Sequence, residues 1–128
     1  MAKHMNYTTL DEIRGELIKQ LKNQSLYPVI GAGFTIGCFA RNGKTPSGNE
    51  MKTEMIQQIS TQGQDITALL TRDLKQISKY YKSIVPRNTR TQYLLDNFTE
   101  VTLPDYSANF LKINWKYIYT FNFDTAIE

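Results

Sequence analysis

The chain has 128 residues, about the size of one ordinary domain, and its 41% hydrophobic content suffices for a packed core, which excludes a disordered chain. The net charge is +3 without any run of basic residues, so direct nucleic-acid binding is not predicted. No apolar run reaches the ~20 residues of a membrane span, and we expect no secretory signal and no membrane partner. The single cysteine, Cys38, excludes an intrachain disulfide and fits a reducing, cytoplasmic location.

The first predicted element is a helix that begins after Thr9. Residues 1–5 are typical of a cloning remnant ahead of a native start at Met5, and they include His4, the single histidine of the sequence. Thr9 and Glu12 have the spacing of a capping box, in which each side chain accepts from the backbone of the other. The apolar residues that follow fall on one helical face: Leu10, Ile13, Leu17, Ile18 and Leu21.

The next elements alternate between strand and helix patterns. Leu26–Ile30 is short and apolar and predicts a buried strand, with Pro28 at its beginning or on an unpaired side. A helical period returns from Asn49. A longer helix is predicted after the N-cap Asp65, ending at Pro86, with an apolar stripe formed by Ile66, Leu69, Leu70, Leu74, Ile77, Tyr81 and Ile84.

The last third predicts two short helices and a strand. Thr89 and Gln92 suggest another cap, and Pro104 is a typical first residue of a helix. Trp115–Phe121 alternates aromatic and β-branched residues, as strands do. Two distant strands with helices between them predict an α/β fold: a truncated, Rossmann-like parallel sheet with a largely helical insert between the two motif-bearing strands. We expect residues 6–128 to be the N-terminal part of one domain that continues past Glu128.

Two candidate phosphate loops overlap between Tyr27 and Glu50, and the sequence favours the first. Gly43-Lys44-Thr45 looks like the end of a Walker A loop, but the first glycine of that motif should be residue 38, which is cysteine. Thr45 also precedes Pro46, which disfavours the helical geometry that a magnesium-binding threonine needs. Mg-ATP chemistry is therefore not predicted.

The favoured loop is Gly31–Thr35, which follows the first predicted strand. Glycines at a strand end allow a tight turn and let a pyrophosphate approach backbone N–H groups. With Gly37 the spacing is near the dinucleotide fingerprint but not identical to it. Glu50 or Glu54 is a candidate for the acidic residue that usually follows. The other interpretation is a glycine turn that binds nothing.

A second polar cluster lies at the end of the second predicted strand. Thr120, Asn122 and Asp124 alternate with aromatic residues, so a continuing strand would place their polar groups on one face. Ligands bind at the carboxyl edge of open α/β sheets. The alternative is that Asn122 and Asp124 form a turn and cap a following helix.

Taken in order, these two motifs resemble the sirtuin-like (Sir2-like) domains, and most closely the bacterial branch found in antiphage defence proteins. The resemblance rests on the sequence GAGFT at Gly31–Thr35, on Pro46 and Ser47, and on the run WKYIYTFNFDTAIE from Trp115 to Glu128. It covers both ends of the region 29–128, whereas the helices between carry little family signal. The resemblance implies a Rossmann-like, NAD-binding domain whose activity is NAD+ hydrolysis, depleting NAD during phage infection.

The resemblance also assigns roles to matching positions. It implies that the pyrophosphate lies along Gly31, Ala32, Gly33 and Phe34, that Thr35 donates a hydrogen bond to it, and that Pro46 and Thr120 belong to the NAD site. Asn122 would be the catalytic residue beside the nicotinamide ribose, and Asp124 would hold the nicotinamide side. A neutral carboxamide such as Asn122 can orient a ribose hydroxyl or a water without competing as a nucleophile.

Two departures from the family limit the expected activity. The family's general base is a histidine downstream of the second motif, so we expect these 128 residues alone to be inactive and to bind NAD+ weakly or not at all. The Cys-x-x-Cys pairs of zinc-bearing deacylases are absent, so no metal is predicted. The alternatives left open are a regulatory module that binds NAD or ADP-ribose without cleaving it, an NAD-dependent deacylase, and a helical scaffold. Unpaired sheet edges predict a homo-oligomer, and the resemblance implies a defence-complex partner as the other possibility in the full protein.

Overall fold

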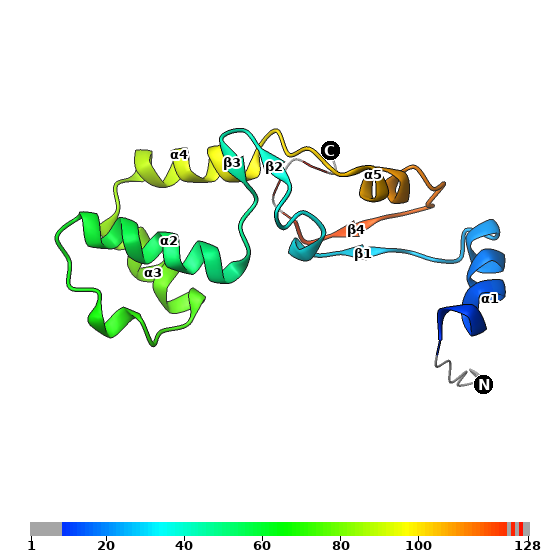
Figure 1. Ribbon diagram of the computed structural model, residues 1–128, viewed down its shortest axis with the longest axis horizontal. Helices are drawn as coiled ribbons and strands as arrows, with labels where there is room; N and C mark the ends of the chain where they lie inside the picture. The colour runs from blue at the N-terminus through cyan, green and yellow to red at the C-terminus, as the bar shows by residue number, and fades with distance from the viewer. Residues whose placement is uncertain (1–8, 123, 125, 127–128) are drawn as a thin grey trace.

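The computed structural model describes residues 9–122, 124 and 126, and helices hold 54% of them (Figure 1). The predicted remnant 1–5, with His4, lies outside the described residues. The α-helices are α1 (Leu10–Lys22), α2 (Gly48–Thr61), α3 (Leu74–Ile84), α4 (Arg87–Phe98) and α5 (Asp105–Leu111), with 3-10 helices η1 (Ala32–Phe34) and η2 (Thr67–Leu69). The strands are β1 (Val29–Ile30), β2 (Phe39–Ala40), β3 (Gly43–Lys44) and β4 (Tyr119–Thr120). Within this described part, no helix is both long enough and apolar enough to cross a membrane.

The predicted Rossmann-like α/β fold is wrong, because the structure is a mostly helical small domain with two two-stranded sheets. β1 and β4 pair in parallel, with Val29 opposite Tyr119 and Ile30 opposite Thr120. β2 and β3 pair separately and antiparallel, and among the described residues no third strand joins either pair. A parallel sheet is normally covered on both faces. Here Val29 is 66% exposed and Tyr119 is 55% exposed, so the β1–β4 pair lacks that cover.

The main core lies between α2 and α3, at one end of an elongated molecule (Figure 1). Ile59 and Ile77 are fully buried at their contact, and the Tyr81 hydroxyl donates to Gln58 Oε1 (2.7 Å). The buried cluster consists of Met55, Ile56, Ile59, Ile77, Tyr81 and Val85. The β1–β4 pair, α5 and α1 occupy the other end, and the β2–β3 hairpin lies between the two ends.

The single long helix predicted after Asp65 is wrong, because the chain forms the short η2 and then begins α3 at a new N-cap, Asp73. Asp65 Oδ1 accepts from the backbone N–H of Thr67 (2.9 Å), the first residue of η2, but the N-cap of η2 is Ile66 and not the predicted Asp65. Asp73 Oδ1 accepts from the backbone N–H of Gln76 (2.7 Å), and this capping box starts α3 one residue later. Leu70, which falls in the break, is 59% exposed instead of being part of the core stripe.

Three further helix starts were predicted from the sequence, and the structure agrees with some of them only. The capping box of Thr9 and Glu12 is confirmed, with Thr9 N donating to Glu12 Oε2 at 2.8 Å. The helix start predicted at Pro104 is confirmed to within one residue: Pro104 is the N-cap, and α5 begins at Asp105. The cap predicted at Thr89 is wrong, because α4 already begins at Arg87, directly after Pro86, and Thr89 lies inside it.

The β2–β3 hairpin leads into α2, and the residues that connect them form part of the wall of the cavity described below. Thr45 N donates to Cys38 O (2.9 Å), and Gly37 N donates to Thr45 O (2.8 Å). Pro46 follows, and Ser47 caps α2 in a capping box with Glu50, whose Oε2 accepts from Ser47 N at 2.7 Å. The hydrogen bonds from Ser47 hold the pKa of the Glu50 carboxyl below its ordinary 4.5.

This lowered pKa predicts a pH-dependent stability that Glu50→Gln removes. Glutamine retains the capping pattern but does not titrate. Because the folded-state pKa is lowered, the stabilisation is present above the unfolded value of 4.5 and is lost as the pH falls through the folded value. We expect the difference in unfolding free energy between wild type and Glu50→Gln to shrink between about pH 5 and pH 3 in urea titrations. A difference that stays constant over this range would contradict the assignment.

Candidate functional site

The two predicted motifs meet at the end of the β1–β4 pair. Phe121 N donates to Ile30 O (3.0 Å), which extends the pairing by one residue and holds the two chain segments together. Beyond it, β1 turns through η1, where Phe34 N donates to Gly31 O (3.0 Å). The structure therefore brings residues 31–35 close to residues 120–122 and 124, although the sheet around them is not the predicted one.

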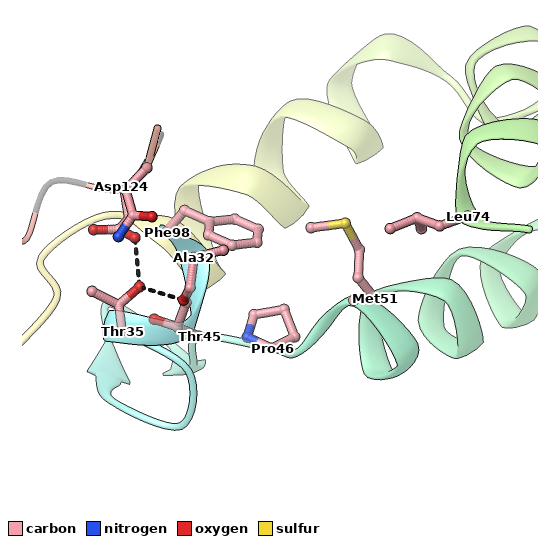
Figure 2. A pocket seen from close by; sticks show the side chains of 10 residues that line it. Ala32, Thr35, Thr45, Pro46, Met51, Leu74, Phe98 and Asp124 are labelled. Atoms are coloured by element: carbon pink, nitrogen blue, oxygen red, sulfur yellow. Dashed lines mark hydrogen bonds between the residues drawn. The ribbon is translucent and has the colours of Figure 1, made fainter. Parts of the chain in front are cut away.

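A buried hydrogen bond joins the two segments. The Thr35 hydroxyl donates to Asp124 Oδ2 at 2.6 Å, and it lies 3.4 Å from the Ala32 carbonyl oxygen (Figure 2). Thr35 is fully buried and Asp124 is 8% exposed. Asp124 Oδ1 accepts from Ala126 N (3.1 Å), so both carboxylate oxygens are engaged. A hydroxyl bonded to a buried carboxylate is among the stronger hydrogen bonds in proteins, and this one connects residues that are 89 positions apart.

A cavity of about 180 Å³ opens beside this hydrogen bond. Figure 2 shows Thr35 and Asp124 on one side of it, with Met51 and Leu74 across from them. It is lined by Ala32, Thr35, Thr45, Pro46, Gly48, Met51, Leu74, Phe98, Asn122 and Asp124. The cavity thus lies between the helical end of the molecule and the strand end, and most of its wall is apolar.

Two residues of this cavity wall carry buried polar atoms without a hydrogen-bond partner among the described residues. They are Thr45, through Oγ1, and Asn122, through both Oδ1 and Nδ2. An unpartnered buried polar group costs about 1–3 kcal/mol, so native proteins rarely keep one without a partner from water or a ligand. Because each of these atoms is buried from solvent, they lie within the wall of the cavity and not on its open surface.

The glycines of the first motif line a second, more open cavity on the other side of the loop. It measures about 470 Å³ and is lined by Val29, Ile30, Gly31, Gly33, Phe34 and Phe110. A Cβ atom built on Gly31 or Gly33 meets nothing within 4 Å, and positive φ among the glycines occurs at Gly37 and Gly63 instead. The expected tight turn therefore does not require these two glycines.

The cavities divide the predicted site residues into groups. Ala32, Thr35, Pro46, Asn122 and Asp124 line the first cavity, and Gly31, Gly33 and Phe34 line the second. Thr120 lines neither of these two cavities, because β4 ends there and its exposed hydroxyl turns back to accept from Asn122 N (3.0 Å). The prediction that Thr120 shares a face with Asn122 and Asp124 is therefore wrong.

The acidic candidates for a ribose contact lie elsewhere. Glu50 is engaged with Ser47, and Glu54 accepts from the Tyr93 hydroxyl. Both line a different cavity, together with Lys44 and Asn97. The rejection of the Walker loop agrees with the geometry: Gly43 and Lys44 form β3, and the next helix begins only at Gly48.

Sequence reasoning missed five residues of the first cavity: Thr45, Gly48, Met51, Leu74 and Phe98. The three apolar ones are spread over α2, α3 and α4, and nothing in their local sequence sets them apart from core residues. Thr45 carried a signal, since a polar residue before proline at the end of a hairpin is poorly suited to a core.

Neighbouring Cys38 does not add a nucleophile to the site. Burial raises the pKa of its thiol, and the nearby Asp124 carboxylate raises it further. The protonated form is therefore favoured, whereas reactive cysteines need a stabilised thiolate. Within the described residues no three His, Cys, Asp or Glu side chains gather in a way that would hold a metal ion.

No protein-family model, curated protein or solved structure matches this chain. The resemblance to sirtuin-like domains therefore rests on the residues of the two motifs and stays a prediction.

Replacing Thr35 tests the buried hydrogen bond. Thr35→Val keeps the side-chain shape but leaves Asp124 Oδ2 without its donor, so we expect a loss of about 1.5–3 kcal/mol in the free energy of unfolding. Thr35→Ser keeps the hydroxyl and should lose clearly less. Urea denaturation followed by circular dichroism measures both variants. Equal stability of the valine and serine variants would show that the bond to Asp124 does not stabilise the junction.

Proposed function

We propose that this chain supplies the nucleotide-binding part of an NAD+ glycohydrolase. The observation that carries the proposal is the first cavity, whose wall brings Asn122 and Asp124 of the second motif together with Ala32 and Thr35 of the first. Their proximity to the Gly31–Thr35 loop is what the two motifs predict. Pocket space on both sides of one loop suits a ligand with two chemically different ends.

The two cavities support a division of the ligand. The first, at about 180 Å³, is smaller than the roughly 300–1,000 Å³ of sites for drug-sized ligands, so it suits one heteroaromatic ring and its substituent. Its apolar wall from Met51, Leu74 and Phe98 suits the faces of such a ring. The second cavity, with open space above Gly31 and Gly33, suits the diphosphate, because its oxygens can approach the backbone there.

The residues of the site then have distinct tasks. Hydrolysis of bound NAD+ breaks the bond between the ribose carbon and the pyridinium nitrogen, which keeps the electron pair, while a water oxygen bonds to that carbon and loses a proton. Asn122 orients a ribose hydroxyl or that water through its amide. Asp124 places a negative charge beside the positively charged ring. Both oxygens of Asp124 already accept hydrogen bonds, so its task is electrostatic rather than proton transfer.

One observation favours a second candidate, a module that binds NAD or ADP-ribose without cleaving it. The described residues include no histidine, and the one carboxylate lining the first cavity, Asp124, already accepts two hydrogen bonds. Both facts make this part of the chain a poor proton acceptor for the attacking water. An NAD-dependent deacylase is a third candidate, and no feature of the described residues favours it over the other two.

The biological setting is part of the same proposal. We infer NAD depletion in a bacterial antiphage response in the cytoplasm from the resemblance. The exposed β1–β4 pair supports a contact with a second copy or a defence-complex partner, because Val29 and Tyr119 are more than half exposed and Phe121 is 81% exposed. Aromatic residues exposed on a short, unpaired strand edge are typical of a protein interface.

The decisive test is NAD+ consumption by the protein in its full natural length, with Asn122→Ala as the variant. The Asn122 amide has no partner among the described residues, so the alanine variant should remain as stable as the wild type. We expect turnover in the wild type and a loss of at least a hundredfold in Asn122→Ala, the usual effect of removing a positioning or proton-transfer group. Activity that survives the substitution would place the chemistry in another part of the protein.

Gly33→Ala separates binding from folding in the same protein. The added methyl meets no atom within 4 Å, and Gly33 is not among the glycines with positive φ, so stability should be unchanged or slightly raised. The methyl would, however, obstruct a diphosphate on the loop. We expect weaker NAD+ binding by calorimetry at unchanged thermal stability. Unchanged NAD+ affinity would contradict the diphosphate position, and NAD+ binding without turnover in the wild type would favour the non-catalytic module.

A further inference from the structure

We propose that Glu54 and Tyr93 are positioning residues that fix Met51 in the wall of the first cavity and so set how closely this cavity fits a flat ring. This inference rests on the proposed NAD+ site. It assigns a task to two residues that lie outside both sequence motifs and do not line the first cavity themselves. It starts from the hydrogen bond that joins α4 directly to α2, in which the Tyr93 hydroxyl donates to Glu54 Oε2 at 2.5 Å.

The chemistry of this bond makes it a firm link between the two helices. A hydroxyl that donates to a carboxylate forms a charge-assisted hydrogen bond, which is about twice as strong as a bond between neutral groups. Tyr93 is 8% exposed, so water competes little for the bond. Burial, and after it the Glu54 carboxylate, raise the pKa of the Tyr93 hydroxyl. The hydroxyl therefore keeps its proton, and Glu54 keeps its donor, at the neutral pH of a binding experiment.

The bond closes a triangle formed by α2, α4 and the β2–β3 hairpin. α4 is tied to the hairpin near its C-terminal end, where Asn42 N donates to Asp96 O (3.0 Å). α2 is tied to the same hairpin through the chain, since Pro46 directly precedes the N-cap of this helix. The bond between Glu54 and Tyr93 is the third side, and it sets how far α2 lies from α4.

The wall residue Met51 lies between two corners of this triangle. It is on α2, one turn before Glu54 and after the connection to the hairpin. Phe98, which lines the same cavity, is the last residue of α4 (Figure 2). Residues three apart on a helix share one face, so a shift of Glu54 away from α4 carries Met51 with it. Loss of the bond therefore widens the cavity between Met51 and Phe98.

A wider cavity weakens the hold on a ring and leaves the rest of the ligand unaffected. Dispersion attraction is steep, and a gap of about 0.5–1 Å already loses a quarter to a half of it. ADP-ribose has the diphosphate and both riboses of NAD+ but lacks the pyridine ring, so it does not use this wall. The ratio of the NAD+ affinity to the ADP-ribose affinity therefore reports the fit of the cavity.

The test measures both affinities by calorimetry on the full-length protein. Tyr93→Phe removes the hydroxyl and keeps the aromatic ring, and Glu54→Ala removes the acceptor. In each variant we expect the NAD+ affinity to fall about fivefold, the effect of one hydrogen bond, at unchanged ADP-ribose affinity. Glu54→Gln keeps an acceptor oxygen for Tyr93 and should retain the NAD+ affinity of the wild type.

Tyr81→Phe is the matched control, because it removes the same group from a bond at the α2–α3 contact. The Tyr81 hydroxyl donates to Gln58 Oε1 (2.7 Å), Tyr81 is 5% exposed, and neither residue lines the first cavity. The buried cluster of α2 and α3 holds that contact without the hydroxyl. We expect Tyr81→Phe to lower the thermal stability and to leave the ratio of the two affinities as in the wild type.

Each other outcome overturns the inference. If the wild type binds NAD+ and both Tyr93→Phe and Glu54→Ala bind it equally well, the pair has no part in the site, while the NAD+ site stands. If these variants lose NAD+ and ADP-ribose affinity alike, if both fail to fold, or if Tyr81→Phe changes the ratio as much, the bond serves the fold and not the ring. If the wild type itself does not bind NAD+, the proposed function fails, and the role of the pair fails with it.

Discussion

The buried hydrogen bond from Thr35 to Asp124 is the interaction on which the candidate site depends. It joins the loop after β1 to the segment after β4 across 89 positions of sequence. The parallel pairing of β1 and β4 brings these segments together, but each strand contributes only two residues, so the pairing alone is a weak constraint. The side-chain bond, which is shielded from water, is what gives the junction a defined geometry.

The helical end of the molecule completes the site. Met51, Leu74 and Phe98 from α2, α3 and α4 close the cavity over Asn122 and Asp124, and the β2–β3 hairpin places Thr45 between the two ends. The stability of the α2–α3 core and the fit of the cavity are therefore coupled, because both use the same helices. Such a site at the contact of two structural units is a common location for ligand binding.

Local signals in the sequence were sufficient where one hydrogen-bonding pattern decides the structure. The capping box at Thr9 and the helix start at Pro104 are examples. The meeting of the two motifs also followed from the pattern, since both follow short apolar runs that pair in parallel. Predictions that depended on the packing of distant segments were wrong. The Rossmann-like sheet was inferred from two strands without knowing what covers them, and the long helix after Asp65 was inferred from a period that the Asp73 cap interrupts. The unpartnered state of Thr45 depends on tertiary packing, which a local pattern does not contain.

The most direct test of the account is to locate NAD+ on the protein by nuclear magnetic resonance. Intermolecular nuclear Overhauser effects between the pyridine ring protons and assigned methyl groups report which cavity holds the ring, even when binding is weak. The account predicts contacts from the ring to the methyl groups of Ala32 and Thr45. Contacts confined to other surfaces, such as the cavity beside Gln92 and Asn97, would contradict the assignment of this junction as the binding site.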